Sequence, residues 1–393
     1  MSDLPAYERE PYRTEMETRV LRVGEEEGRP YAVLADTLLF PEGGGQPADH
    51  GFLGPVAVLD VQKRAGEVRH YLAGPAAPGP DALRLDWPRR FDHMQQHTGQ
   101  HLLTAMALER YGWGTTAFHL GEEVSDIELD APRIDPDQLR ELEAAVAAEI
   151  RLGRAVTCRR VAPEELPGLP VRSRGLPEGF QGDVRLVEIA GLDLNTCGGT
   201  HLRSTAELEC LCLLGTESLR GGTRVFYAAG GRVRRRLAAH EQRNGALRGL
   251  LGAPDEGLVD VLTVRLEQQR GLEKRIRHLE EELAEQAAAA LAGQPGDLVE
   301  RHFEGKDAAF LQRTARLLAA QAPAKAAFLT ATRDGQHTFV LAAGDASPLD
   351  VPARGRDMAA LLSARGGGSG RLFQGKAGSL DGRAQALERL RRG

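Results

Sequence analysis

The chain has 393 residues, of which 41% are hydrophobic and 27% charged, and its formal net charge is −6. This length exceeds what one core usually holds, so we expect two or three domains, and the composition excludes a disordered chain. Because the net charge is negative, any contact with nucleic acid has to come from a local basic patch.

The ends and the cysteines indicate a cytoplasmic protein without membrane contact. No segment approaches the roughly 18 to 20 consecutive apolar residues that a membrane span needs, and the acidic N-terminus lacks the zones of a signal peptide. The four cysteines, Cys158, Cys197, Cys210 and Cys212, do not have the spacing of a disulfide scaffold. We predict that Cys158, Cys210 and Cys212 are small buried hydrophobic residues.

Residues 1–88 are predicted to form a small β-barrel-like domain. Short β-type runs are broken by Gly, Pro and Asp, and Ala65-Gly66 separates two of them as a hairpin turn. The runs cover residues 18–23, 31–34, 56–62 and 68–72. Between Pro41 and Pro47 stand Gly43, Gly44 and Gly45, which favour a loop with positive φ and close backbone approach.

Residues 89–230 are predicted to form an α/β domain. From Phe91 the apolar residues follow a helical period, and residues 136–152 form a second amphipathic helix. Residues 124–129 and 184–189 are the expected strands. His97 and His101 lie four positions apart on the first helix, so their imidazoles share one face.

A second pair of metal-binding residues follows about a hundred positions later. Cys197 and His201 are also four residues apart, and they flank a Gly-Gly-Thr insert. Three imidazoles and one thiolate suit tetrahedral zinc. The two pairs together predict one shared Zn²⁺ site whose ligands are His97, His101, Cys197 and His201.

The remaining chain is predicted to contain a helical segment, residues 231–294, and a C-terminal α/β domain, residues 295–393. Within a helix over 258–292, Leu272, Ile276, Leu279 and Leu283 follow a heptad spacing. This spacing fits either a coiled coil or an antiparallel hairpin with residues 232–250. The last domain is expected to contain helices over 307–320 and 357–364, strands near 328 and 339, a glycine-rich loop and a terminal helix. The whole chain is therefore expected to be α+β.

Residues 370–377 almost match the phosphate-binding loop of nucleotide hydrolases. That motif needs Ser or Thr after its lysine to hold Mg²⁺, and here Ala377 follows Lys376. Nucleotide hydrolysis at this segment is therefore rejected, and the expected activity needs no ATP.

Three segments together resemble the AlaX-type alanyl-tRNA editing proteins, which are related to the editing domain of alanyl-tRNA synthetase. They are residues 41–46, residues 93–103 and residues 197–201, and they occur in the family's order. The segment after about Pro295, with its glycine-rich stretch 366–370, looks like the C-terminal domain of the synthetase. The long form of the family is therefore implied.

The resemblance implies trans-editing, the hydrolysis of Ser-tRNA(Ala) and, as a second substrate, Gly-tRNA(Ala) at the zinc site, which serves translation fidelity. Thr37 and Gln46 are the candidates for the catalytic site: Thr37 matches the position that faces the seryl side chain, and Gln46 is placed to bond the 3′-terminal nucleotide. Substrate binding is assigned to Gly43, Gly44, Gly45 and Thr98. The expected partners are the acceptor end of tRNA(Ala) and a second copy bound through the helical or C-terminal region. His93 is assigned a packing or supporting role.

Two other functions fit the same residues. Four protein ligands close a tetrahedral site, whereas catalysis needs an open position, so zinc either activates water or only positions substrate and structure. A zinc-stabilised tRNA-binding module without catalysis is one alternative. Another aminoacyl-tRNA hydrolase on the same scaffold, such as one for D-aminoacyl esters, is the second.

Overall fold

The computed structural model describes residues 4–172 and 182–392 and has mixed α+β architecture, as predicted. Two compact units follow each other along the chain, Met1–Ala246 and Leu247–Gly393. The helix α4 (Gly231–Leu251) contains the boundary between them. In the described part of the chain, no helix combines the length and apolarity that crossing a membrane requires. The four domains proposed from the sequence, with their three boundaries, stay predictions.

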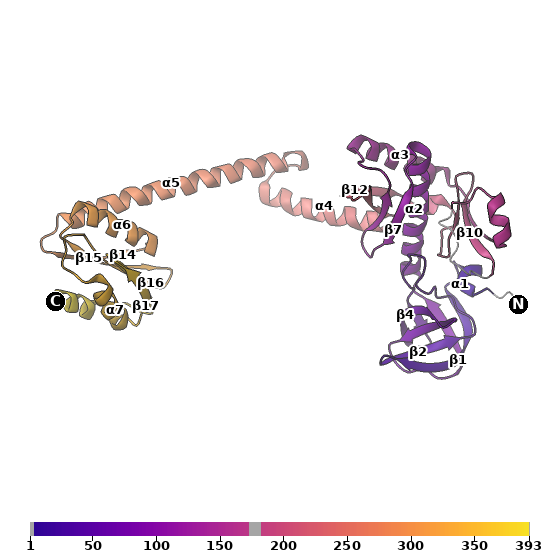
Figure 1. Ribbon diagram of the computed structural model, residues 1–393, viewed down its shortest axis with the longest axis horizontal. Coiled ribbons are helices and arrows are strands. Elements are labelled where there is room, and N and C mark those ends of the chain that lie inside the picture. The colour runs from indigo at the N-terminus through magenta and orange to yellow at the C-terminus, as the bar shows by residue number, and fades with distance from the viewer. Residues whose placement is uncertain (1–3, 173–181, 393) are drawn as a thin grey trace. The chain divides into compact units, whose positions relative to one another are not determined.

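The first unit begins with the short helix α1 (Ala6–Arg9) and a closed six-stranded barrel, in the strand order β1-β2-β5-β4-β3-β6 (Figure 1). The strands are β1 (Glu15–Glu26), β2 (Arg29–Leu34), β3 (Gly51–Leu53), β4 (Val56–Arg64), β5 (Glu67–Leu72) and β6 (Gly79–Leu85). Ala65 and Gly66 have φ of 49° and 81° between β4 and β5, which is the two-residue hairpin predicted from the sequence. The barrel is closed, so it has no free strand edge.

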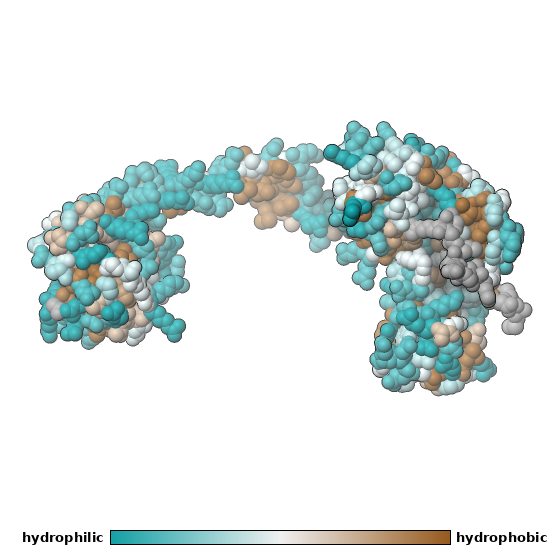
Figure 2. Space-filling view, in the orientation of Figure 1, coloured by the Kyte–Doolittle hydropathy of each residue, from teal (hydrophilic) through white to brown (hydrophobic). Residues whose placement is uncertain are grey.

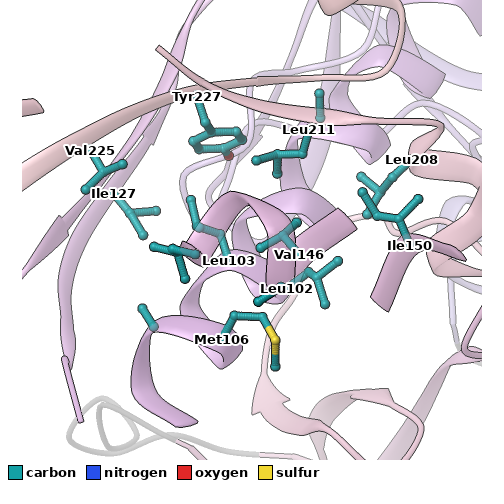
Figure 3. Close-up of a cluster of buried hydrophobic side chains, with 14 of the residues drawn as sticks. Leu102, Leu103, Met106, Ile127, Val146, Ile150, Leu208, Leu211, Val225 and Tyr227 are labelled. Atoms are coloured by element: carbon teal, nitrogen blue, oxygen red, sulfur yellow. The ribbon is translucent and has the colours of Figure 1, made fainter. Parts of the chain in front are cut away.

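The helix α2 (Trp87–Tyr111) positions the first histidine pair. It begins at Asp86, whose side chain accepts a hydrogen bond from the backbone N of Arg89, and it ends at Gly112 with φ of 70°. Every residue from His93 to Ala107 is buried, because α2 runs through the centre of the unit. Figure 3 shows Leu102, Leu103 and Met106 of this helix inside the main apolar cluster.

Two antiparallel sheets and one further helix surround α2. The four-stranded sheet has the order β12-β13-β8-β7, and the three-stranded sheet has the order β11-β10-β9. Their bounds are β7 (Thr115–Leu120), β8 (Ser125–Leu129), β9 (Val156–Val161), β10 (Val184–Ile189), β11 (Asp193–Thr196), β12 (Leu211–Leu219) and β13 (Gly222–Ala229). The helix α3 (Pro136–Leu152) buries Leu142, Val146 and Ile150 against the same cluster (Figure 3). The 3₁₀ turns Pro163–Gly168 and Thr205–Leu208 join these elements.

The second unit contains the long helix α5 (Leu258–Ala292) after a 3₁₀ turn over Asp255–Gly257, with the bounds expected from the sequence. Its last turns bury Ala284, Ala288 and Leu291 against α6 (Ala308–Gln321) and a five-stranded sheet. The sheet has the order β14-β15-β16-β18-β17 and the members β14 (Leu298–Glu304), β15 (Ala326–Arg333), β16 (Gln336–Ala343), β17 (Arg365–Ser369) and β18 (Leu372–Ala377). Helices α7 (Val351–Leu361) and α8 (Arg383–Arg391) complete the unit.

Three sequence predictions were wrong in detail. Residues 365–369 form the edge strand β17 rather than a glycine-rich loop, because Gly366 and Gly368 let the carbonyls of β18 approach where a Cβ would clash. Helix α7 starts at Val351, since Asp350 caps it and Pro352 is tolerated in the first turn. Cys158 is exposed on β9 rather than buried, and Cys210 and Cys212 are only partly buried.

Candidate metal centre

The structure brings the two sequence pairs together. His97 and His101 come from the middle of α2, while Cys197 and His201 come from the turn after β11. One ligand atom from each of the four residues lies within 4.8 Å of all the others. The Cys197 Sγ is 3.3 Å from the Nε2 of His97 and 3.3 Å from the Nε2 of His201.

These separations fit a tetrahedral zinc ion. Zn–N bonds of about 2.0 Å and Zn–S bonds of about 2.3 Å place tetrahedral ligand atoms roughly 3.3 to 3.5 Å apart, which the two sulfur–nitrogen distances match. Burial acts to raise the pKa of the Cys197 thiol, but the charges of His97 and His201 and hydrogen bonds from the imidazoles hold it well below its usual value. A thiolate is the form that binds metal. The donor set therefore suits Zn²⁺ in both geometry and chemistry.

Each imidazole has a separate partner on its Nδ1, so that the Nε2 atoms face the centre. His97 Nδ1 lies 2.9 Å from Gln46 Oε1, and His201 Nδ1 lies 3.2 Å from Thr98 Oγ1. His101 Nδ1 lies 3.4 Å from Asp193 Oδ2. Such partners fix the tautomer and the ring orientation of a metal-binding histidine. Two of the three partners are neutral, and Asp193 is the charged one.

The turn that carries Cys197 and His201 is held by local contacts. Arg185 of β10 donates from Nη1 to the carbonyls of Cys197 and Gly199, at 2.8 and 2.7 Å. A Cβ on Gly199 would lie 2.2 Å from the ring of His97, so only glycine fits there. Gln46 bonds the same turn, because the backbone N of Thr200 donates to Gln46 Oε1 and Gln46 Nε2 donates to Thr200 Oγ1.

A cavity of about 670 Å³ opens beside the four residues. Its lining combines ligands, small residues and hydroxyls: Gly44, Gly45, His97, Gln100, His101, Thr104, Leu108, Gly114, Thr115, Phe118, Val171, Arg172, Asn195, Thr196, Cys197 and Gly198. Gly44 and Gly45 have φ of 57° and 80°, and a Cβ on Gly45 would clash with the ring of Phe118. The glycine loop therefore reaches the cavity wall through these two residues.

The other predicted site residues lie elsewhere. Gly43 pairs with Gln46 in a β-bridge at the base of the loop, and it is outside the described cavity lining. Gln46 and Thr98 are buried behind the ligands, where they orient His97 and His201. The Thr37 hydroxyl is buried against His70, 2.8 Å from its Nε2, and accepts from the backbone N of Leu39. Burial lowers the pKa of His70 to about 4, so this pair is neutral at pH 7.

Several residues of the centre were not found from the sequence. Asp193 orients His101, and Gln100, Thr104, Thr115 and Arg172 line the cavity. A usable signal existed for Gln100 and Thr104, which lie three and seven residues after His97 and therefore on its side of α2. His93 is buried with its pKa lowered to about 3 by desolvation, and it is outside the described cavity lining, in agreement with a packing role.

A second group of possible ligands does not form a comparable centre. His119, Asp126 and Glu128 lie close together on β7 and β8, and His119 is exposed. Arg224 of β13 pairs with Asp126 and Glu128 at 3.3 and 2.6 Å, so the carboxylates already have a cation.

Comparison with known proteins shows the family. Residues 184–227 match the family described as "Threonyl and Alanyl tRNA synthetase second additional domain". "Alanyl-tRNA editing protein Aarsd1" of Mus musculus is 35% identical over 360 residues, which cover 91% of this chain and 86% of that protein. The chain belongs to the AlaX-type alanyl-tRNA editing proteins. "Alanyl-tRNA editing protein AlaX-L" of Pyrococcus horikoshii is 30% identical over 304 residues, 72% of each chain.

The family relation extends to the synthetases. "Alanine--tRNA ligase" of Methanoregula boonei is 30% identical over 389 residues, 95% of this chain but 42% of that protein. The C-Ala domain from Aquifex aeolicus alanyl-tRNA synthetase is a similar solved structure at 21% identity, with 24% of this chain and 87% of that chain covered and a TM-score of 0.23. The family-model match contains Cys197 and His201, and the longer alignments span both units of this editing protein.

Proposed function

We propose that this chain is a trans-editing deacylase that hydrolyses the aminoacyl ester of Ser-tRNA(Ala), with Gly-tRNA(Ala) as a second substrate. The observation that carries the proposal is the convergence of three imidazoles and a thiol at one point, with His97, His101 and Cys197 in the wall of a 670 Å³ cavity. The relatives named alanyl-tRNA editing proteins support it, since they align with 91% and 72% of the chain. A cavity of this volume is large enough for a terminal nucleotide and its aminoacyl group.

Two groups of residues form the proposed centre: four that would hold the metal ion and three that orient the imidazole rings. His97, His101, Cys197 and His201 would hold Zn²⁺, and Gln46, Thr98 and Asp193 fix the three rings through their Nδ1 atoms. When bound, Zn²⁺ supplies Lewis acidity that polarises an ester carbonyl or activates a water. Gly44 and Gly45 present bare backbone to the cavity, which allows close approach of a ribose or an ester.

Discrimination of serine from alanine requires a polar group in the cavity. Gln100 Nε2 donates to Thr104 Oγ1 at 2.9 Å, and Thr104 Oγ1 lies 2.9 Å from Thr115 Oγ1. A site that hydrogen-bonds a substrate hydroxyl rejects the analogue without it far more strongly than apolar fit allows. We assign recognition of the seryl hydroxyl to Thr104 and Thr115, because the Thr37 hydroxyl is engaged by His70.

The substitution Thr115→Val tests this assignment. It keeps the shape of the side chain and removes the hydroxyl, so kcat/KM for Ser-tRNA(Ala) should fall by about tenfold, the usual effect of one hydrogen bond, while Gly-tRNA(Ala) is unaffected. Thr116→Val is the matched control, because the Thr116 hydroxyl donates to the Glu128 carbonyl and is outside the described cavity lining. Equal losses on both substrates would contradict the assignment.

The function itself is tested by deacylation of purified Ser-tRNA(Ala), Gly-tRNA(Ala), Ala-tRNA(Ala) and D-Ala-tRNA(Ala), together with the zinc content of the protein. We expect about one zinc per chain and preferred turnover of the seryl ester. Zinc content without turnover of any ester would favour a zinc-stabilised tRNA-binding module. Preferred turnover of the D-alanyl ester would favour a different aminoacyl-tRNA hydrolase.

We also propose that two copies associate through α5. Leu272, Ile276, Leu279 and Leu283 are 61, 57, 49 and 46% exposed, so the described residues of the second unit do not cover this heptad face. The antiparallel hairpin with residues 232–250 stays the alternative, and it predicts a chain that remains monomeric. Figure 2 shows further apolar atoms at the turn between α4 and α5, where Leu250 and Val259 are both 74% exposed.

The sequence of α5 favours a parallel pair. Ile276 takes an a position and Leu272 and Leu279 take d positions, the combination typical of two-stranded parallel coiled coils. In this register Arg275 of one copy faces Glu280 of the other across the seam. An antiparallel pair would instead place Glu273 opposite Glu280, a repulsion that opposes the attraction of its Arg275–Glu282 contact. Gln269 is a polar residue at an a position and fixes the register.

The pair is tested by light scattering after gel filtration. We expect the mass of two chains for the natural protein and of one chain for the double substitution Ile276→Lys and Leu279→Lys, because buried lysines repel across the seam. Lys274→Glu, which changes charge at an exposed position away from the seam, should leave the dimer intact. A natural chain that elutes as a monomer at micromolar concentration would exclude the proposal.

A further inference from the structure

Arg172 is the only Arg, Lys, Asp or Glu in the described lining of the cavity beside the metal centre. The segment that carries it is tied to β11, because its backbone N donates to the Leu194 carbonyl at 2.8 Å and it forms a bridge with Asn195. Its side chain is 26% exposed, whereas its partner Asp193 is fully buried. The guanidinium therefore extends from a buried carboxylate to the cavity.

A continuous set of contacts connects this arginine to the metal centre. Arg172 donates from Nε to Asp193 Oδ1 at 2.6 Å, and Nη2 bonds the same oxygen. The other carboxylate oxygen, Oδ2, lies 3.4 Å from His101 Nδ1. Asp193 thus contacts Arg172 with one carboxylate oxygen and the imidazole of His101 with the other. A change at Arg172 is expected to reach His101 through this single carboxylate.

The guanidinium of Arg172 has N–H donors that Asp193 does not engage. It carries five N–H groups in a planar fork, and Asp193 engages Nε and Nη2. Within the described residues no acceptor bonds Nη1. Arginine binds phosphate oxygens through charge-assisted, bidentate hydrogen bonds, which are stronger than neutral ones.

The substrate of the proposed function offers one anion at this place. The scissile ester is on the ribose of the 3′-terminal nucleotide, and the 5′ phosphate of that nucleotide is one ribose away. If the ester lies against His97, His101 and Cys197, the phosphate falls within the same cavity, where Arg172 is the one permanent positive charge of the described lining. Nearby lysines that could substitute for it are missing from that lining.

We propose that Arg172 binds the phosphate of the 3′-terminal nucleotide and that Asp193 couples this contact to the orientation of His101. This inference rests on the proposed function and names the residue that recognises the substrate as a nucleotide ester. Arg172 is a substrate-binding residue, and Asp193 is a positioning residue that acts through His101.

The test compares Ser-tRNA(Ala) with 3′-O-seryladenosine, which has the same ester and ribose but no phosphate. The measured quantity is the ratio of kcat/KM for the first substrate to kcat/KM for the second, because damage to folding or to the metal centre cancels in it. Arg172→Gln should lower this ratio by about 10- to 100-fold, the effect of a hydrogen bond to a charged group. Arg172→Lys should lower it less, since the charge remains.

Two further variants separate the two halves of the proposal. Asp193→Asn should weaken zinc binding by about 10- to 100-fold in competition with a chelator, and it should lower the ratio less than Arg172→Gln does, because Arg172 loses its anchor but keeps its charge. Arg224→Gln is the matched control, because Arg224 is 29% exposed, pairs with carboxylates and is outside the described cavity lining, so it should change neither quantity. An unchanged ratio in Arg172→Gln overturns the phosphate contact, and unchanged zinc affinity in Asp193→Asn overturns the coupling. If the natural protein hydrolyses neither substrate, the proposed function itself fails.

Discussion

Replacing Cys197 with alanine is expected to lower kcat/KM for Ser-tRNA(Ala) by more than about 100-fold and to remove zinc from the purified protein. Residues that only orient a metal ligand already account for 10- to 100-fold in affinity or activity, and Cys197 supplies the one anionic donor of the set. Its sulfur is 3.3 Å from both His97 and His201, so its loss leaves three imidazoles around an incomplete site.

Deacylation kinetics and metal analysis on the same preparation decide this prediction. Cys212→Ala is a suitable control, because Cys212 is a free, partly buried thiol of β12 that is outside the group of metal-binding residues in the described chain. The control should retain both zinc and turnover. Full turnover by a zinc-free Cys197→Ala protein would mean that the metal has no part in hydrolysis.

The four proposed ligands could be predicted because local geometry alone pairs them. Residues four apart on a helix share a face, so His97 and His101 had to converge. Cys197 and His201 are brought to one point by a short glycine turn. The helix α5 and the hairpin at Ala65-Gly66 could be predicted as well, since an apolar spacing over about two heptads and a two-residue turn each depend on neighbouring positions only.

The residues that orient the proposed ligands could not be predicted, because only tertiary packing brings them next to the histidines and the glycine turn. Gln46 meets Thr200 across 154 residues, and Asp193 meets His101 across 92. A glutamine beside a glycine loop is equally compatible with bonding a nucleotide, which was the role expected for it. For Thr37 the expectation was a hydroxyl that faces the seryl side chain, whereas the fold buries this hydroxyl against His70 of the barrel.

The prediction of a glycine-rich loop at residues 365–369 was wrong for a different reason. Glycine lowers strand propensity, so pattern analysis favours a loop. In the structure Gly366 and Gly368 face β18 where its backbone comes closest, and a Cβ there would lie 2.3 and 2.2 Å from carbonyl oxygens. Close approach of two backbones, which has no sequence signal of its own, thus overrides propensity.

Breaking the buried ion pair between Arg90 and Asp49 is expected to destabilise the first unit by about 3 to 5 kcal/mol, because removal of one partner leaves the other charge buried without compensation. Both side chains are 0% exposed. Arg90 of α2 donates to Asp49 Oδ2 and to the carbonyls of Pro11 and Leu38, at 2.9, 2.9 and 2.6 Å. Arg90 therefore ties helix α2, which carries His97 and His101, to the chain segments on both sides of the glycine loop.

Urea unfolding followed by tryptophan fluorescence measures this loss selectively, because Trp87 and Trp113, the two tryptophans of the chain, both lie in the first unit. Arg90→Met should shift the urea midpoint strongly, and Arg140→Met, which breaks the exposed pair with Asp137, should change the free energy of unfolding by less than about 1 kcal/mol.

Adding Asp49→Leu to Arg90→Met should recover part of the lost stability, since no charge then stays buried. Recovery would be incomplete, because the carbonyls of Pro11 and Leu38 and the backbone N of Phe40 still lose their partners. A double variant less stable than Arg90→Met would show that the hydrogen bond from the backbone N of Phe40 to Asp49, rather than the charge of Asp49, dominates the stability of this junction.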